Sequence, residues 1–426
     1  FICALEKELP EEGTVIDGKG TITMPGFINS RSRAFVSRIA RCFPEDYNCD
    51  FWKGSPNYLR INPFVNIALE ILDDEEIKAL LELALYEAID GGTTTLVDQG
   101  INRDVALMLN LCHKKGVRCL SAPMLSNKSK LAEVGFWNDV DFDTDIDDAE
   151  ALEKLKWNKA LIYKWRESEI VQAAYGLNSP EVCSSSFIRD VVTESKKDDA
   201  FLLISCNETK MEREEAFKKH SLYPVELLRK CDALTPRTIL NGMSQTSKED
   251  INILKSFLSK VAYCPQEAAL DSSMPMFLPF RDHHINIALG TGRTSVSILE
   301  QLRAMAITSK LDSGKRQNIQ SVDVLYAATE AGRRNYRNKK IGKIQTGFAA
   351  DLIMIDAEKP NLTPGYLPVV DIVYHLRSSD IKNVIVQGKQ IKDNGKVIGF
   401  NISKDISTAK KAIEKVWTQA NKHCVF

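Results

Sequence analysis

Two arginines one residue apart, Arg31 and Arg33, follow an apolar segment in the stretch PGFINSRSRAF (25–35). The apolar residues before them are typical of a buried strand, so both guanidiniums are expected where that strand ends. A guanidinium is always protonated and offers no lone pair, so neither arginine can bind a metal ion. The pair can instead neutralise buried carboxylates, hold the phosphate or carboxylate group of a ligand, or remain solvated if the loop turns outward.

Glu208 and Arg293 bring further charge to the ends of later strands. Glu208 closely follows an expected strand at 201–206, and Arg293 directly follows an expected strand at 285–292. The carboxylate of Glu208 could act as a general acid or pair with an arginine. Arg293 would either add to a positive pocket with the first two arginines or lie on an exposed loop.

Cys206, Cys264 and Ser205 also lie at or near the ends of expected strands. A nucleophilic thiol needs a lowered pKa, usually from a neighbouring histidine, and a nucleophilic serine needs a base. No histidine follows an expected barrel strand, so we expect buried, inert thiols and no serine nucleophile. The six histidines of the chain are His113, His220, His283, His284, His375 and His423.

Short apolar strands alternate with helical patterns through the middle of the chain. Apolar residues at helical spacing in 77–88, for example, follow acidic residues at 73–76 and stop at Gly91-Gly92. Eight units of this kind predict the α/β class and a (β/α)₈ TIM-like barrel, with an open doubly wound sheet as the structural alternative. The expected strands are 23–29, 93–98, 117–123, 170–177, 201–206, 237–242, 260–265 and 285–292.

Both ends of the chain contain short segments in which apolar and polar residues alternate, separated by Gly and Asn-Gly turns. This pattern predicts a small composite β-sandwich domain built from residues 1–22 and 341–400. It would flank a barrel of residues 23–340. Residues 401–426 contain an amphipathic helix, which we expect to pack on the β domain or on the barrel.

The composition of the chain indicates which cellular compartment and which classes of partner to expect. The 426 residues include 56 basic and 57 acidic side chains, so a net charge of −1 favours neither nucleic acid nor a membrane as partner. No apolar run approaches a membrane span, and no signal peptide is visible. Ten cysteines without a CxxC pair predict reduced thiols and a cytoplasmic location.

Several motifs, taken in order along the chain, resemble those of a known family. IDGKGTITMPGFIN (16–29), followed by a barrel and by IGKIQTGFAADLIMID (341–356), is similar to the amidohydrolase superfamily. The branch resembled is that of cytosine, guanine and adenosylhomocysteine deaminases and triazine hydrolases. Supporting motifs are GGTTTLVD (91–98), NSPEVCS (178–184), CNETKME (206–212), PVELL (224–228), VAYCP (261–265) and IALGTG (287–292).

The resemblance implies a divalent metal at the mouth of the barrel, which makes a hydroxide from bound water. This sequence has other residues at the implied ligand positions. The His-x-His pair falls on Arg31 and Arg33, the strand-five His on Ser205, and the strand-eight Asp on Gly292. The strand-six His falls on Gly242, or on Asn241 if the alignment shifts by one residue. We therefore expect no metal cofactor.

The resemblance also implies substrate contacts, which fall on Asn178 and Tyr263, and an acid/base residue, which persists as Glu208. These substitutions favour a catalytically inactive, amidohydrolase-like pseudoenzyme. It would serve as a structural or interaction subunit, in a homodimer, in a larger assembly or with an active paralogue. Two alternatives stay open: a binding protein for an anionic small molecule at Arg31, Arg33 and Arg293, and an atypical hydrolase or deaminase of C–N bonds.

Overall fold

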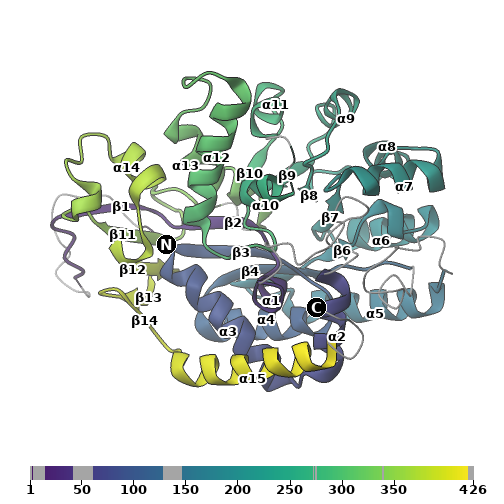
Figure 1. Cartoon of the computed structure of the whole chain (residues 1–426), viewed down its shortest axis with the longest axis horizontal. Helices are drawn as coiled ribbons and strands as arrows, with labels where there is room; N and C mark the ends of the chain where they lie inside the picture. Colours follow the sequence, from purple (N-terminus) through teal and green to yellow (C-terminus); the bar gives the residue numbers. More distant parts are fainter. Residues whose placement is uncertain are drawn as a thin grey trace.

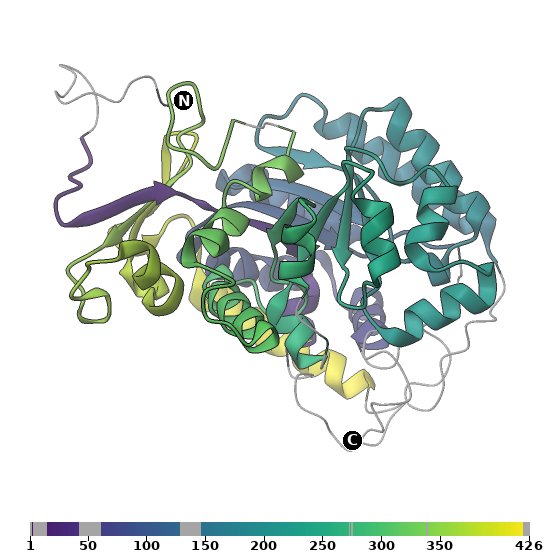
Figure 2. The ribbon, with the colours of Figure 1, turned by 90° about the horizontal axis from the view of Figure 1, so that it is seen from above.

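The computed structural model of the chain describes residues 2, 15–41, 61–127, 146–271, 273, 276–337 and 340–420. Parallel strands run through the middle of the molecule, and helices surround them (Figure 1). A smaller sheet lies at one side, joined to the barrel through the strand β1 (Figure 2).

The central strands form the predicted (β/α)₈ barrel. The strands form two parallel sheets, in the orders β2-β3-β4-β5 and β10-β9-β8-β7-β6. β5 and β6 are two parts of one interrupted strand, so the two sheets join there. On the other side, a parallel bridge between Ser32 and Gly292 joins β2 to the residues after β10. The strands are β2 (Phe27–Ser32), β3 (Thr93–Gly100), β4 (Arg118–Pro123), β5 (Val171–Ala173), β6 (Tyr175–Leu177), β7 (Leu202–Cys206), β8 (Thr238–Gly242), β9 (Lys260–Tyr263) and β10 (Ile287–Leu289).

Helices between the strands bury one apolar face against the barrel. The helix α3 (Asp74–Asp90) begins at a capping box formed by Asp73 and Glu76, and Ile77, Leu81 and Leu85 lie on its buried face. The other barrel helices are α1 (Ala34–Ile39), α2 (Asn62–Ile71), α4 (Arg103–Lys115), α5 (Asp148–Trp165), α6 (Ser185–Lys197), α7 (Lys210–His220), α8 (Pro224–Lys230), α9 (Lys248–Leu254), α10 (Pro265–Leu270), α11 (Phe277–Asp282), α12 (Ile298–Ser313) and α13 (Ser321–Ala328).

The small domain is a five-stranded antiparallel sheet in the order β1-β11-β12-β13-β14. An Asn394-Gly395 turn, with both residues at positive φ, joins its last two strands. The second sheet of the expected sandwich is not found among the described residues. The strands are β1 (Thr21–Pro25), β11 (Leu352–Asp356), β12 (Ile381–Val386), β13 (Lys389–Asp393) and β14 (Lys396–Val397), and α14 (Pro368–His375) lies between β11 and β12 in the chain.

The single strand expected at 23–29 is divided between the two sheets. The division falls at Gly26, where an added Cβ would lie 2.1 Å from Cγ2 of Thr94. Only a residue without a side chain allows this close approach. The chain can therefore leave the antiparallel sheet as β1 and enter the barrel as β2, which delivers Arg31 to the barrel mouth.

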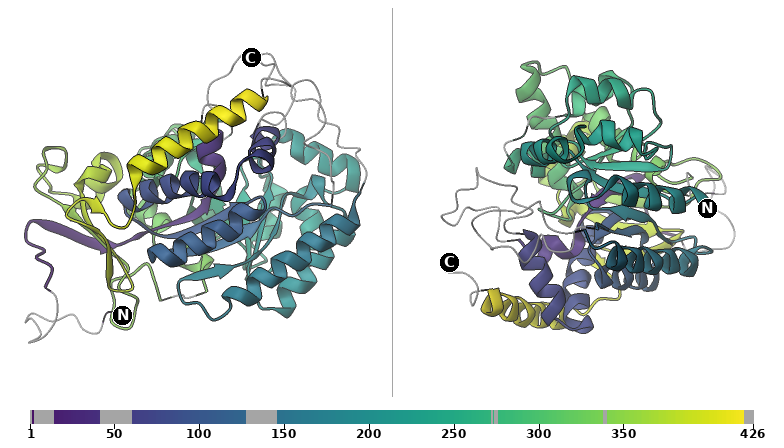
Figure 3. Two further views of the ribbon diagram at one scale, coloured as in Figure 1. Left: turned by 90° about the horizontal axis from the view of Figure 1, so that it is seen from below. Right: turned by 90° about the vertical axis from the view of Figure 1, so that its right-hand side faces the viewer.

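The last described helix, α15 (Ile402–Ala420), packs against α2 and α3 on the outside of the barrel (Figure 3). The rings of Phe64 and Trp417 contact each other at a tilt of 56° with their centres 4.8 Å apart, and Lys415 pairs with Glu76. No helix in the described part of the chain is long and apolar enough to cross a membrane.

Candidate functional site

Arg31 lies at the end of β2, where the carboxyl ends of the barrel strands meet. Its side chain is about 1% exposed and forms ion pairs with two carboxylates. One terminal nitrogen donates to Oε1 of Glu208, and the other donates to Oε2 of Glu267 at 3.2 Å. The same nitrogen lies 3.9 Å from Sγ of Cys264. Of the interpretations of Arg31 considered above, the structure therefore supports charge pairing.

Arg293 extends this network on the other side. Its guanidinium donates to Oε1 of Glu267 and, at 2.5 Å, to Oδ1 of Asp271. Burial alone would raise the pKa of Glu267, but the charges of Arg31 and Arg293 outweigh burial and hold that pKa below its ordinary value. Glu267 is therefore an ionised carboxylate clamped between two guanidiniums. Arg293 is buried rather than exposed on a loop.

Arg33 lies beside the network without joining it. Its side chain is 3% exposed, and Nε has no hydrogen-bond partner. Among the described residues its guanidinium forms no ion pair, and Glu208 and Glu267 act on it only at longer range. Burial lowers the pKa of Arg33. A buried guanidinium without an ion pair is costly, so Arg33 is the member of the arginine pair for which the described residues provide no ion-pair partner.

Glu208 is positioned by the first turn of α7. Its backbone N–H donates to Oε2 of Glu212 at 3.0 Å, and the same oxygen accepts from the N–H of Thr209 in a capping box. Burial raises the pKa of Glu212 well above its ordinary value, and the charges of Glu181 and Glu208 add to that rise. The local sequence CNETKME thus fixes the loop that carries Glu208 toward Arg31.

Asp98, at the carboxyl end of β3, does not pair with the arginines. Its carboxylate accepts from the backbone N–H of Ala34 at 2.9 Å and from Oγ of Ser121 at 3.4 Å. Burial raises the pKa of Asp98 to about 7. Asp98 therefore anchors α1 to β3 rather than balancing the charge of a guanidinium.

We expect Asp98 to make the stability of the chain depend on pH. Its folded pKa, about 7, lies above its ordinary value of 3.8, so the folded chain holds an extra proton between these limits. Asp98 therefore stabilises the fold below about pH 4, and that contribution falls by up to about 1.4 kcal/mol per pH unit as the pH rises toward 7. Urea unfolding at pH 5 and pH 8 should show this loss in the natural chain and a smaller loss in Asp98→Asn.

Asp190→Asn, on the exposed face of α6, is the control for this prediction. Equal pH dependence of the natural chain and Asp98→Asn would contradict the assignment.

Ser205 and Asn241, at two implied ligand positions, bind a glutamine inside the barrel. Oε1 of Gln99 accepts from Nδ2 of Asn241 at 2.9 Å and from Oγ of Ser205 at 3.3 Å. Nε2 of Gln99 donates to the carbonyl of Leu177. A neutral amide thus links β3, β7 and β8 across the barrel interior.

Asn178 forms backbone hydrogen bonds to neighbouring segments, and Tyr263 is buried in the core. The N–H of Asn178 donates to the carbonyl of Leu125 at 2.8 Å, and its carbonyl accepts from the N–H of Ser205. Tyr263 ends β9, is about 1% exposed, and burial raises the pKa of its phenol. Neither side chain forms a hydrogen bond with Arg31 or Glu208.

Glu267, Asp271 and Gln99 were missed by the sequence analysis. Glu267 and Asp271 follow β9 in the segment CPQEAALD, and Gln99 ends the run TTTLVDQ. The available signal was their place at the end of β3 or in the segment that follows β9, because polar side chains at the carboxyl ends of barrel strands meet at one mouth.

The residues at the mouth do not fit the divalent metal that the resemblance implies. A Cβ added at Gly292 would lie 1.6 Å from Oε2 of Glu267, and one added at Gly242 would lie 2.5 Å from Cγ of Glu208. The carboxylates therefore fill the space of the implied strand-eight and strand-six ligands. No group of three or more His, Cys, Asp or Glu side chains suited to a metal occurs in the part of the chain that the structure describes.

Comparison with known proteins assigns the family. A model of the amidohydrolase family matches residues 22–391. The chain belongs to the amidohydrolase family. Its barrel is also similar to that of a zinc-bound adenosine deaminase from Xanthomonas campestris, with a TM-score of 0.82 at 19% identity, over 94% of this chain and 87% of that one.

Relatives of this amidohydrolase are named as deaminases. The chain is 25% identical to the 5'-deoxyadenosine deaminase of Methanosarcina acetivorans, over 96% of this chain and 89% of the relative. It is 26% identical to the 5-methylthioadenosine/S-adenosylhomocysteine deaminase of Thermoanaerobacter pseudethanolicus, over 93% and 88% of the two chains. The prediction of a catalytically inactive structural or interaction subunit is therefore wrong, because the chain resembles enzymes over nearly its whole length. The expectation that it is not an enzyme is likewise unsupported.

The cavity at the centre of the network is small. It measures about 10 Å³ and adjoins Arg31, Glu208 and Glu267, together with Gly242, Ser244, Cys264 and Asp271. This volume is about the smallest that admits one water molecule. The network can therefore hold a water in hydrogen-bond reach of charged groups.

Proposed function

We propose that this amidohydrolase is a deaminase that hydrolyses the exocyclic C–N bond of an adenine nucleoside. The observation that carries the proposal is the match to two deaminase groups over more than nine-tenths of the chain. The persistence of Glu208 at the position that the resemblance gives to the acid/base residue supports it.

The proposed reaction uses water and the residues of the mouth. Water adds to the carbon that bears the amino group, and ammonia leaves, so that an amine becomes a carbonyl. We place the attacking water in the one-water cavity beside Glu208. Glu208 takes the proton of that water and passes it to the leaving nitrogen. No step is assigned to a metal, because the residues of the mouth do not fit one.

Arg33 indicates which chemical group the substrate should carry. None of the described residues forms an ion pair with its buried guanidinium, which favours a ligand that brings a carboxylate or another anionic acceptor to the mouth. A substrate with such a group would satisfy Arg33 and place the reacting ring near Glu208.

We also propose a cytoplasmic location and a homodimer or larger assembly. Six free, buried cysteines in the described residues support a reducing compartment. Light scattering of the purified chain tests the assembly, and a monomer at all concentrations would contradict it.

The test of the proposed function is ammonia release from adenosine, 5'-deoxyadenosine, 5-methylthioadenosine and S-adenosylhomocysteine. The loss of adenine absorbance reports the same reaction independently. We expect turnover of at least one of these nucleosides by the purified chain. No release from any of them at high enzyme concentration would contradict the proposal.

A further inference from the structure

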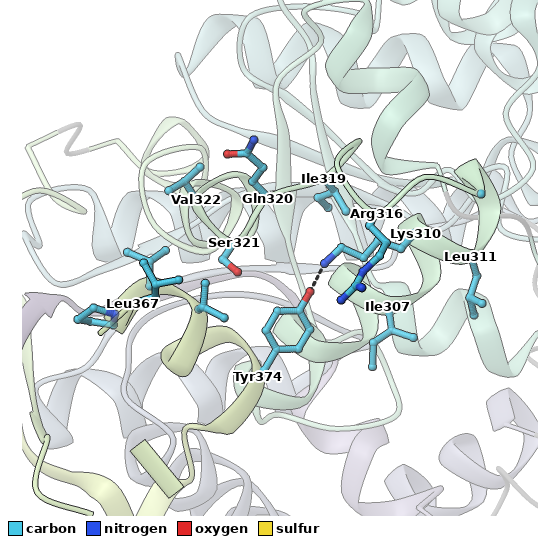
Figure 4. Close-up of a pocket in the computed structure, with 14 residues that line it drawn as sticks. Ile307, Lys310, Leu311, Arg316, Ile319, Gln320, Ser321, Val322, Leu367 and Tyr374 are labelled. Carbon is cyan, nitrogen blue, oxygen red and sulfur yellow. Dashed lines mark hydrogen bonds between the residues drawn. The ribbon is translucent and has the colours of Figure 1, made fainter. Parts of the chain in front are cut away.

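A large apolar groove lies apart from the barrel mouth, between α12, the segment 314–322 and the start of α14 (Figure 4). Its volume is about 1140 Å³, and it shares no lining residue with the cavity beside Glu208. The groove therefore stands as a separate feature of the molecule.

Most of the groove wall is aliphatic, and much of it faces water. Leu311 is 77% exposed, Leu367 66% and Val322 54%. Leaving such side chains in water is unfavourable, and a contiguous apolar surface of this kind marks a binding site. The aliphatic and proline side chains of the wall are Ile307, Leu311, Ile319, Val322, Leu367, Pro368, Val369 and Val370.

In the part of the chain that the structure describes, two cations are the only charged groups in the wall. Lys310 and Arg316 reach toward the middle of the groove, where Nζ of Lys310 donates to the hydroxyl of Tyr374 (Figure 4). No aspartate or glutamate lines the groove, and neither cation has an ion pair in the described ranges. The groove thus combines an apolar wall with uncompensated positive charge.

We propose that this groove binds an amphipathic anion, a molecule with an aliphatic chain and a single carboxylate headgroup. The carboxylate pairs with Arg316 and Lys310, and the chain covers the aliphatic wall. An apolar ligand without charge would leave both cations unpaired, and a small anion without a chain would leave the wall in water. The inference does not depend on the deaminase activity.

Binding of sodium decanoate, below the concentration at which it forms micelles, tests the proposal. Calorimetric titration should show saturable binding by the natural chain, and thermal unfolding should shift upward. Acetate, which has the headgroup alone, and decanol, which has the chain alone, should each bind at least about tenfold more weakly, the factor that 1.4 kcal/mol represents. Equal binding of decanol and decanoate would overturn the role of the cations.

Three variants separate the two parts of the ligand. Arg316→Glu reverses an exposed charge and should weaken decanoate binding at least about tenfold. Val322→Asp places a charge in the aliphatic wall and should weaken decanoate binding by a similar factor. Arg189→Glu, on the exposed face of α6, should leave binding unchanged. Unchanged binding by the first two variants would overturn the proposal. So would conversion of a dimeric natural chain to a monomer by Val322→Asp without any decanoate binding, because the groove would then be an interface between copies.

Discussion

Replacing Arg31 by methionine is expected to lower the free energy of unfolding by about 3–5 kcal/mol. The side chain is about 1% exposed and pairs with Glu208 and Glu267. Methionine keeps an unbranched chain of similar length but removes the guanidinium that pairs with Glu208 and leaves Glu267 with Arg293 as its remaining ion-pair partner. Breaking a buried pair costs far more than the pair contributes, because the remaining charge cannot return to water. Urea unfolding at pH 7.5, above the ordinary pKa of a glutamate, measures the effect.

Arg33→Met is the matched control for this prediction. It removes an equally buried guanidinium from the same strand end, but one that has no ion pair among the described residues. We expect it to leave stability unchanged or to raise it, since an unpaired buried charge is lost. Equal destabilisation by the two variants would show that Arg33 is paired as Arg31 is. No destabilisation by Arg31→Met would mean that the network does not hold the mouth together.

Replacing Glu208 by glutamine is expected to lower kcat for the deamination by about 10²–10⁴-fold. Glutamine has the size of glutamate and can still accept a hydrogen bond from Arg31, but it cannot take a proton from water. The effect should appear in kcat with a smaller change in KM, because the lost step belongs to the transition state. Steady-state kinetics on the best nucleoside measures it.

Glu214→Gln, on the exposed face of α7, is the control for the kinetic prediction. Both variants should fold with the same far-ultraviolet circular dichroism as the natural chain. If Glu208→Gln retained full activity while its stability also stayed unchanged, Glu208 would be neither the proton-transfer group nor an essential partner of Arg31.

The barrel could be predicted from the sequence because each of its strands is short, apolar and followed by a helical pattern. The division at Gly26 could not, because it depends on the approach of Thr94, which is far away in the sequence. A run of seven residues suitable for one strand gives no local sign that it serves two sheets.

The candidate site was predicted in part. The arginines and Glu208 follow strands, so their meeting at one mouth followed from the topology. Their pairing pattern did not, because Glu267 lies on a helix turn after β9 and its contact with Arg31 spans more than two hundred residues. Arg31 and Arg33 also look alike in the sequence, and only the packing separates a doubly paired guanidinium from one that has no ion pair among the described residues.

The central claim is that guanidinium–carboxylate pairs, and not a metal ion, hold the barrel mouth of this amidohydrolase. The most direct test measures the metal content of the purified chain and its thermal unfolding before and after treatment with a strong chelator. The account predicts much less than one divalent metal per chain, and the same melting temperature and activity after chelation. A stoichiometric metal whose removal lowers both stability and activity would contradict it.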